Sequence, residues 1–224
     1  MLQESNKLLI EKIKENKPFV LCRIGMGPET RYIVNYINNG SVGSCNFPNT
    51  GIYYNSKEQL KIFYEMNRQC FVNSDFLACF QGKYTKDQKI ISETFNLKEL
   101  HSRILEPFYI VLEKEKPWSL ELYNKKVLVI NPFVNSFKRQ IANNFKMFKD
   151  KDIFHHDQEF VFYKSYQTSV GNNIHSSWLE TFEIMKQDIK KLDFDIALLG
   201  CGGYGLPLCN FIKSELNKSA IYIG

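Results

Sequence analysis

Short, almost wholly apolar runs alternate along the chain with longer segments whose apolar residues recur at helical spacing. An apolar run of this kind is typical of a strand buried on both faces, and parallel strands need a crossover between them that is usually helical. We therefore predict an α/β fold, a Rossmann-like three-layer sandwich with a mostly parallel sheet. The 224 residues fit one domain, so residues 1–224 are assigned to a single α/β domain.

The predicted elements follow one another in a regular order. Strands are expected at Phe19–Ile24, Asp75–Phe80, Val127–Ile130, Glu159–Tyr166, Phe194–Leu199 and Ser219–Ile223. Helices are expected at Leu2–Glu15, Glu29–Asn38, Lys57–Val72, Lys86–Phe95, Ser136–Phe148, Ser176–Lys191 and Leu206–Leu216. The pattern over Leu97–Glu115 favours helix, and Ser119 is expected to cap a short helix ending near Asn124. The long turn-rich segment Asn39–Ser56 is of a kind that is usually functional or mobile.

The charge and the cysteines of the chain indicate which classes of ligand and which cellular compartment to expect. The net charge is +5, and the Lys and Glu residues are interleaved, so a solvated surface explains most charges while leaving room for an anionic ligand. Nucleic-acid binding is not expected, because no helix-turn-helix, zinc-finger or RNP-like pattern is present. The six cysteines form no Cys-x-x-Cys pair, which favours reduced, mostly buried thiols in a cytoplasmic protein. Neither a signal peptide nor a transmembrane segment is predicted.

The first candidate site is the turn after the strand at Phe19–Ile24. Ligands of open parallel sheets bind beyond the carboxyl ends of the strands. Here Gly25 and Gly27 allow close backbone approach, and Arg23 can bind a diphosphate. Glu29 begins a helix, where it can serve as a base or as a metal ligand. The structural alternative is an ion pair between Arg23 and Glu29 beside an ordinary glycine turn.

The second candidate is the run from Gly200 to Gly205, a literal G-x-G-x-x-G that follows a predicted strand and opens a predicted helix. This context suits phosphate binding by helix N–H groups, so Gly202, Gly203, Tyr204 and Gly205 are assigned to ligand binding. A dinucleotide site is disfavoured, because the next strand ends at Gly224 without an acidic residue for a ribose. The structural alternative is a turn that only lets helix and strand pack closely.

The third candidate is the turn after Val127–Ile130, where Asn131, Phe133 and Ser136 are assigned to ligand binding. Helix capping by Asn135 or Ser136 is the alternative. The run His155-His156-Asp157 has no recognised metal-ligand spacing, and adjacent histidines are expected to point different ways. We interpret it as a solvated loop and assign no metal ligand.

Several of these segments carry a family resemblance. The Arg23–Glu29 turn resembles the Arg-Phe-Gly-Asp-Gly-Glu turn of GT-D-type glycosyltransferases, bacterial enzymes of surface-glycan assembly with a Rossmann-like fold. Later segments resemble a related group of glycosyltransferases encoded in polysaccharide-biosynthesis loci. These segments are Pro117-Trp118-Ser119, Val127–Phe133, Gln140, Phe194–Gly200 and Gly203-Tyr204-Gly205. In such chains the last strand runs on into a further glycine segment, so a chain that stops at Gly224 is expected to be truncated or a shortened relative.

The resemblance implies transfer of a sugar from a nucleotide-sugar donor, with UDP favoured, to a glycan or glycolipid acceptor. It implies catalytic roles for Glu29 and Arg23. In the family an Asp-x-Glu pair can hold Mn or Mg, but Met26 stands at the Asp position here, and a hard cation needs several oxygen ligands. A non-catalytic nucleotide-binding module is the main alternative, and a methyltransferase or dehydrogenase is a third. The oligomeric state, a homo-oligomer included, is left open.

Overall fold

The fold is built on one seven-stranded sheet. A computed structural model describes residues 1–25, 27–43, 49–143 and 152–224. All strand pairs are parallel, in the order β3-β2-β1-β7-β6-β4-β5. The strands are β1 (Val20–Arg23), β2 (Phe76–Cys79), β3 (Lys98–His101), β4 (Val127–Ile130), β5 (Phe160–Tyr163), β6 (Ile196–Leu199) and β7 (Ser219–Tyr222). The predicted α/β class and Rossmann-like sandwich are confirmed.

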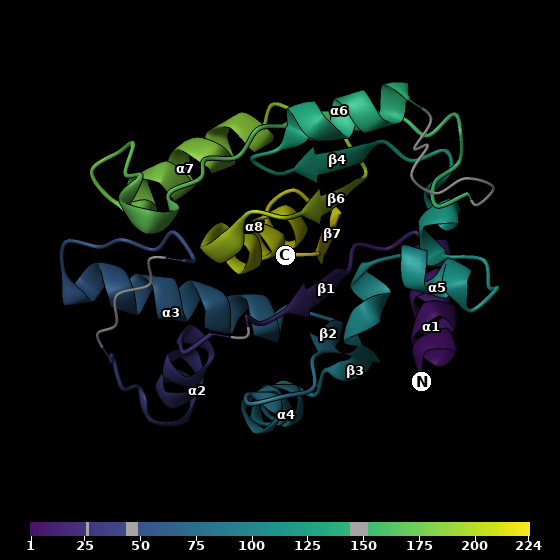
Figure 1. Cartoon of the computed structure of the whole chain (residues 1–224). Helices are drawn as coiled ribbons and strands as arrows, with labels where there is room; N and C mark the ends of the chain where they lie inside the picture. The colour runs from purple at the N-terminus through teal and green to yellow at the C-terminus, as the bar shows by residue number, and fades with distance from the viewer. Residues whose placement is uncertain (26, 44–48, 144–151) are drawn as a thin grey trace.

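Helices cover both faces of the sheet, because neighbouring strand residues point to opposite sides. In β1, Val20 and Cys22 belong to one buried cluster and Leu21 to the other. The first cluster is covered by α2 (Glu29–Asn39), α3 (Lys57–Val72), α4 (Thr85–Thr94), α7 (Trp178–Ile189) and α8 (Gly205–Ser214). The second is covered by α1 (Leu2–Lys14), α5 (Phe108–Leu112) and the short 3-10 helices η1 (Ser102–Leu105) and η2 (Trp118–Leu122). Figure 1 shows α3 and α8 on one side of the strands and α1 and α5 on the other.

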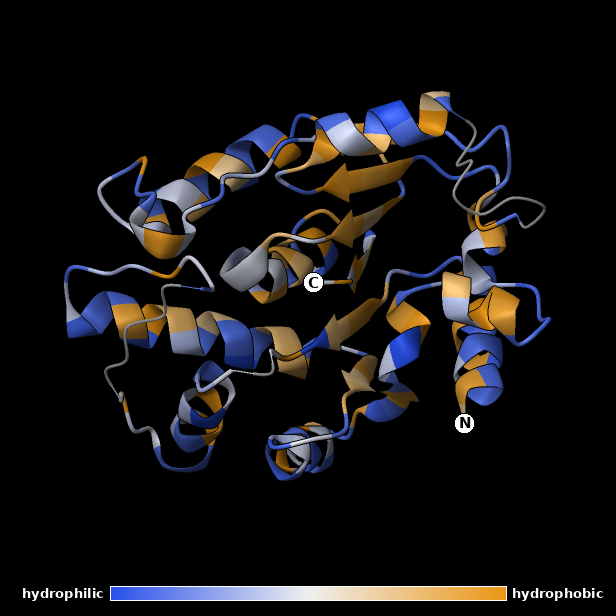
Figure 2. Cartoon of the chain, in the orientation of Figure 1, coloured by the Kyte–Doolittle hydropathy of each residue, from blue (hydrophilic) through white to orange (hydrophobic). Residues whose placement is uncertain are grey.

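The hydropathy of the chain follows these layers. The strands are mostly hydrophobic along their length, whereas the surface helices carry alternating hydrophobic and hydrophilic stripes (Figure 2). In β6 and β4 every residue is buried. Each large aliphatic side chain that is buried this way contributes roughly 1.5–3 kcal/mol to folding. Within the described ranges, every helix is too short or too polar to cross a membrane.

Three local predictions differ from the structure. The segment Leu97–Glu115, predicted as a helix, contains the strand β3 followed by η1 and α5. The strand has no apolar pattern, because Leu100 is its one buried residue, and its pairing with β2 determines its structure. Ser119 lies inside η2 rather than at its cap, and its buried hydroxyl donates a hydrogen bond to the carbonyl of Ile153. Helix α6 spans Val134–Ala142, so it starts earlier than predicted, and the predicted end at Phe148 lies outside the described residues.

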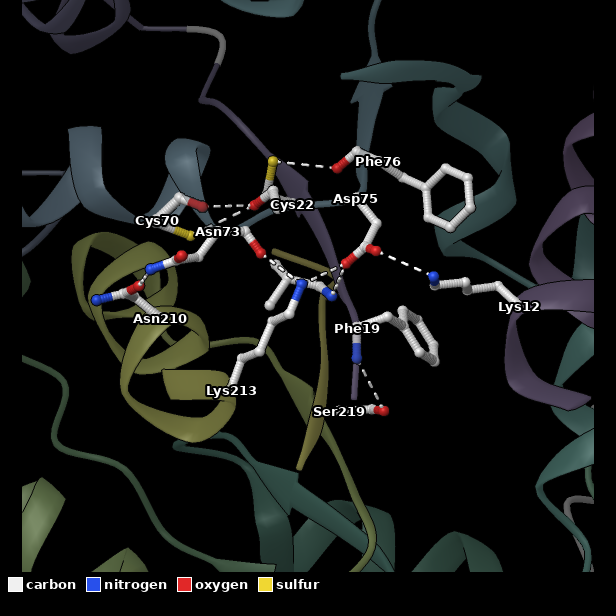
Figure 3. A network of polar contacts seen from close by, with 12 residues as sticks. Lys12, Phe19, Cys22, Cys70, Asn73, Asp75, Phe76, Asn210, Lys213 and Ser219 are labelled. Atoms are coloured by element: carbon white, nitrogen blue, oxygen red, sulfur yellow. Dashed lines mark hydrogen bonds and ion pairs between the residues drawn. The ribbon is translucent and has the colours of Figure 1, made fainter. Parts of the chain in front are cut away.

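The edge of the sheet formed by the strand N-termini is held by a polar network around Asp75 (Figure 3). One Asp75 carboxylate oxygen accepts hydrogen bonds from the Val20 N–H at 3.0 Å and from Lys213 Nζ at 2.7 Å. The other carboxylate oxygen is 3.1 Å from Lys12 Nζ. Asp75 therefore joins β1, α8 and α1 at the end of the sheet away from the candidate site.

Candidate functional site

The candidate site lies where the chain reverses its direction across the sheet. The connection after β4 leads outward to β5, whereas the connection after β6 leads back toward β7 and β1. The carboxyl ends of β4 and β6 therefore flank a topological switch point, where ligands of open α/β sheets bind. Two cavities of about 400 and about 350 Å³ open at this end of the sheet.

The two cavities adjoin, and together we call them the cleft. Both are lined by Asn49, Thr50, Gly202 and Gly224. The smaller cavity, which we call the Arg23 side of the cleft, is also lined by the turn between β1 and α2. The larger one, the Phe133 side of the cleft, is lined by the turns after β4 and β6 and by residues after β5. All three turns singled out from the sequence thus contribute to one cleft.

Arg23 lies at the centre of the Arg23 side. Its guanidinium carbon is 4.7 Å from the centre of the Phe80 ring and 5.7 Å from that of Tyr222, and Nη1 donates to the Ile223 carbonyl at 3.3 Å. Its Nε is buried without a hydrogen-bond partner. Among the described residues, the arginines that form ion pairs are Arg31 and Arg68, so the alternative of an Arg23–Glu29 ion pair is wrong. The cleft therefore holds an unpaired, half-buried cation.

Glu29 lines the same side of the cleft as Arg23 and forms no ion pair with it. Its carboxylate folds back over the turn, so that a methyl group built at Gly25 would lie 2.3 Å from Oε1 and one at Gly27 would lie 2.1 Å from Oε2. The buried Thr30 hydroxyl donates to the Gly25 carbonyl at 2.5 Å and holds the turn. A side chain at Gly25 or Gly27 would therefore displace the Glu29 carboxylate from this position. Glu29 lines the cleft from the first turn of α2.

The turn after β6 is less open than the motif suggests. Gly202 has a φ of +58°, but the Gly203 N–H already donates to the Thr50 carbonyl at 2.9 Å. Tyr204 is 1% exposed, stacks on Trp178 and hydrogen-bonds Thr168. The N–H of Gly203 is therefore occupied within the protein, and Tyr204 belongs mainly to the core.

Gly205 does not line the cleft; it fills the packing role of the structural alternative. A methyl group there would lie 2.2 Å from Cε2 of Tyr222, a residue that is 8% exposed.

We expect Gly205→Ala to lower the free energy of unfolding by about 1–3 kcal/mol, because overpacking outweighs the gain in helix propensity. Denaturant unfolding measures this loss. Adding Tyr222→Leu should recover part of it, and strictly additive losses would contradict the packing role.

Asn131 has a positioning role after β4. Its Nδ2 donates to the Gly200 carbonyl at 2.9 Å, and its Oδ1 accepts the Phe133 N–H at 2.8 Å. Asn131 thus joins the turns on both sides of the switch point. Phe133 lines the cleft and is 57% exposed. Ser136 lies inside α6, exposed and away from the cleft lining, and neither it nor Asn135 caps the helix.

One part of the cleft was not assigned from the sequence. Asn49, Thr50 and Gly51 lie in the long connection between α2 and α3, and they line the cleft where its two sides meet. The Gly51 carbonyl accepts a hydrogen bond from Thr168 at 2.8 Å, which ties this connection to the segment after β5. The unusual length of the connection was its only sequence signal.

The histidine cluster lies at the other end of the sheet, just before β5. His156 and Asp157 are exposed, as expected of a solvated loop. The two histidine rings lie side by side, however, with centres 4.4 Å apart, so the expectation that they point different ways is wrong. His156 Nε2 is 2.9 Å from the Asp157 carboxylate, and ligand atoms of all three residues lie within 4.8 Å of one another.

Comparisons with models of protein families, with curated proteins and with solved structures found no match to this chain.

Proposed function

We propose that the chain is a glycosyltransferase that transfers a sugar from a nucleotide-sugar donor, with UDP favoured, to a glycan or glycolipid acceptor. The observation that carries the proposal is the unpaired Arg23 guanidinium in a cleft at the carboxyl ends of parallel strands. A half-buried guanidinium without an acidic partner keeps its positive charge for an anionic ligand, and its planar donors suit the oxygens of a diphosphate. The resemblance of the Arg23–Glu29 turn to GT-D-type glycosyltransferases supplies the reaction class.

The reaction needs two protein groups in this cleft. The bond between the sugar's anomeric carbon and the diphosphate oxygen breaks, and Arg23 stabilises the negative charge that develops on the leaving diphosphate. The acceptor hydroxyl oxygen forms the new bond to the anomeric carbon, and its proton passes to a base within hydrogen-bond reach. Glu29 is the carboxylate that the described lining residues offer for this step.

The residues do not fit the metal that the family resemblance implies. A hard divalent cation takes several oxygen ligands, usually more than one carboxylate. Among the described residues that line the cleft, Glu29 is the sole acidic side chain. Residue 26, where the family has Asp, is Met and lies outside the described residues. We therefore assign the diphosphate charge to Arg23 and derive no step through a metal.

The first test is Glu29→Gln, which keeps the shape of the side chain against Gly25 and Gly27. We expect the turnover of a donor identified by a thermal-shift screen of nucleotide sugars to fall about 10²- to 10⁴-fold. Affinity for the donor should stay within about twofold, because binding is assigned to other groups. Product formation and calorimetry measure the two effects separately.

Glu93→Gln provides the control, since Glu93 is an exposed residue of α4 whose ion pair with Lys89 lies within the same helix. Wild-type turnover in Glu29→Gln would remove Glu29 from the reaction. The alternative function, a non-catalytic nucleotide-binding module, is favoured by the missing second carboxylate. It predicts donor binding by the wild-type protein without any sugar transfer or release.

A further inference from the structure

The two sides of the cleft differ in chemistry. The Arg23 side contains the charged side chains Arg23 and Glu29. The described residues that line the Phe133 side include no Lys, Arg, Asp, Glu or His. That side instead carries three aromatic residues. Phe133 and Tyr166 enter from the segments after β4 and β5, and the buried Tyr204 follows β6. A ligand with an anionic group for Arg23 at one end and a neutral aromatic group at the other would match both sides.

The backbone of Phe133 is held by hydrogen bonds of the turn, whereas its ring is exposed. Its N–H is bound by Asn131, whose amide group is in turn bound to the Gly200 carbonyl across the switch point. The next residue, Val134, is buried and anchors the start of α6. An exposed aromatic ring on a rigid turn offers a stacking surface that needs little ordering when a ligand binds.

From this contrast we propose that the Phe133 side binds the base of a nucleoside diphosphate, stacked on Phe133, while the diphosphate reaches Arg23 past Gly202 and Gly224. The inference rests on the proposed function and deepens it, since it assigns the two ends of the donor to the two sides. Gln167 and Ser169 line the same side and offer polar groups to the edge of a base. The absence of charged side chains among the described residues of this side favours a neutral heterocycle over a second phosphate.

The test compares ligands that carry a base with one that does not. Calorimetry is performed on the full chain with UDP, CDP, GDP, ADP and inorganic pyrophosphate. We expect at least one nucleoside diphosphate to bind more tightly than pyrophosphate. Phe133→Ala should weaken that nucleotide roughly tenfold or more, as expected for the loss of one base–aromatic stack, and leave pyrophosphate affinity within about twofold. Phe133→Tyr should retain nucleotide binding.

Phe137→Ala is the matched control, because Phe137 is 37% exposed one turn further along α6 and does not line the cleft. Equal wild-type affinity for pyrophosphate and every nucleotide, no nucleotide binding at all, or equal losses in Phe133→Ala and Phe137→Ala would each overturn the inference. These are binding measurements, so a protein with Phe133-dependent nucleotide affinity but no sugar transfer would contradict the proposed transferase and support the base site.

Discussion

Replacement of Arg23 by Met is expected to weaken nucleotide binding strongly while leaving the protein as stable as the wild type, or more stable. The buried Nε has no hydrogen-bond partner, and the guanidinium has no acidic neighbour among the described residues that would be left unpaired. Methionine keeps an apolar stem against Phe80 and Tyr222 and removes a charge that has no acidic partner. Loss of function with a gain in stability is typical of a residue retained for its ligand.

The size of the binding effect follows from the charge of the ligand. A hydrogen bond to a charged group contributes about 1.5–3 kcal/mol, so UDP and pyrophosphate should both bind roughly ten- to hundredfold more weakly to Arg23→Met. Transfer should fall further, because the charge on the diphosphate grows in the transition state. Arg23→Lys is expected to be intermediate, since an ammonium provides charge without the planar pair of donors.

Arg103→Met is the matched control for this experiment. The Arg103 guanidinium lies 4.8 Å from the Tyr109 ring, an arrangement like that of Arg23 over Phe80, but it does not line the cleft. Calorimetry and thermal unfolding on the two variants separate a ligand-binding role from general charge loss. Undiminished affinity for UDP in Arg23→Met, or equal losses in both variants, would contradict the assignment of the diphosphate to Arg23.

Most of the fold could be predicted from the sequence, because strands buried on both faces are apolar throughout. Val127–Ile130 is apolar at every position, and its four residues are all buried in β4. The edge strand β3 could not be predicted this way, since Leu100 is its sole buried residue and pairing with β2 supplies the rest. The local hydropathy pattern thus predicts strands that are buried on both faces. It does not predict an edge strand, whose structure depends on pairing with its neighbour.

The candidate site divides in the same way. The turns after the strands were visible in the sequence, because glycines and an arginine follow apolar runs. The sequence did not show which other segments contact these turns. The placement of β7 beside β1 brings the Ile223 carbonyl to Arg23, and the connection between α2 and α3 brings the Thr50 carbonyl to Gly203. Both contacts join residues far apart in sequence, and they decide which groups of each turn remain available to a ligand.

Asp75→Ala is expected to be the most destabilising of the charge-removing substitutions considered for this chain. Burial alone would raise the pKa of Asp75, but hydrogen bonds from Lys213, the Val20 N–H and Lys12 outweigh burial and lower the pKa below its ordinary value of 3.8. Removing the carboxylate leaves the Val20 N–H without its acceptor and Lys213 without an acidic partner, while Lys12 keeps its ion pair with Glu15. A loss of about 2 kcal/mol in the free energy of unfolding is expected, or roughly 4–8 °C in Tm.

The lowered pKa also fixes the pH dependence of this contribution. A carboxyl whose folded pKa is depressed stabilises the fold above its unfolded pKa, and the contribution is lost as the pH falls through the folded pKa. Asp75→Asn should therefore unfold more readily than the wild type at neutral pH, and the two should converge as the pH drops below 3.8. Denaturant unfolding across this range measures the difference.

Asp193→Asn is the control, because Asp193 is exposed and pairs with Lys126 at the surface. A constant gap between wild type and Asp75→Asn at every pH would show that the Asp75 charge does not stabilise the fold.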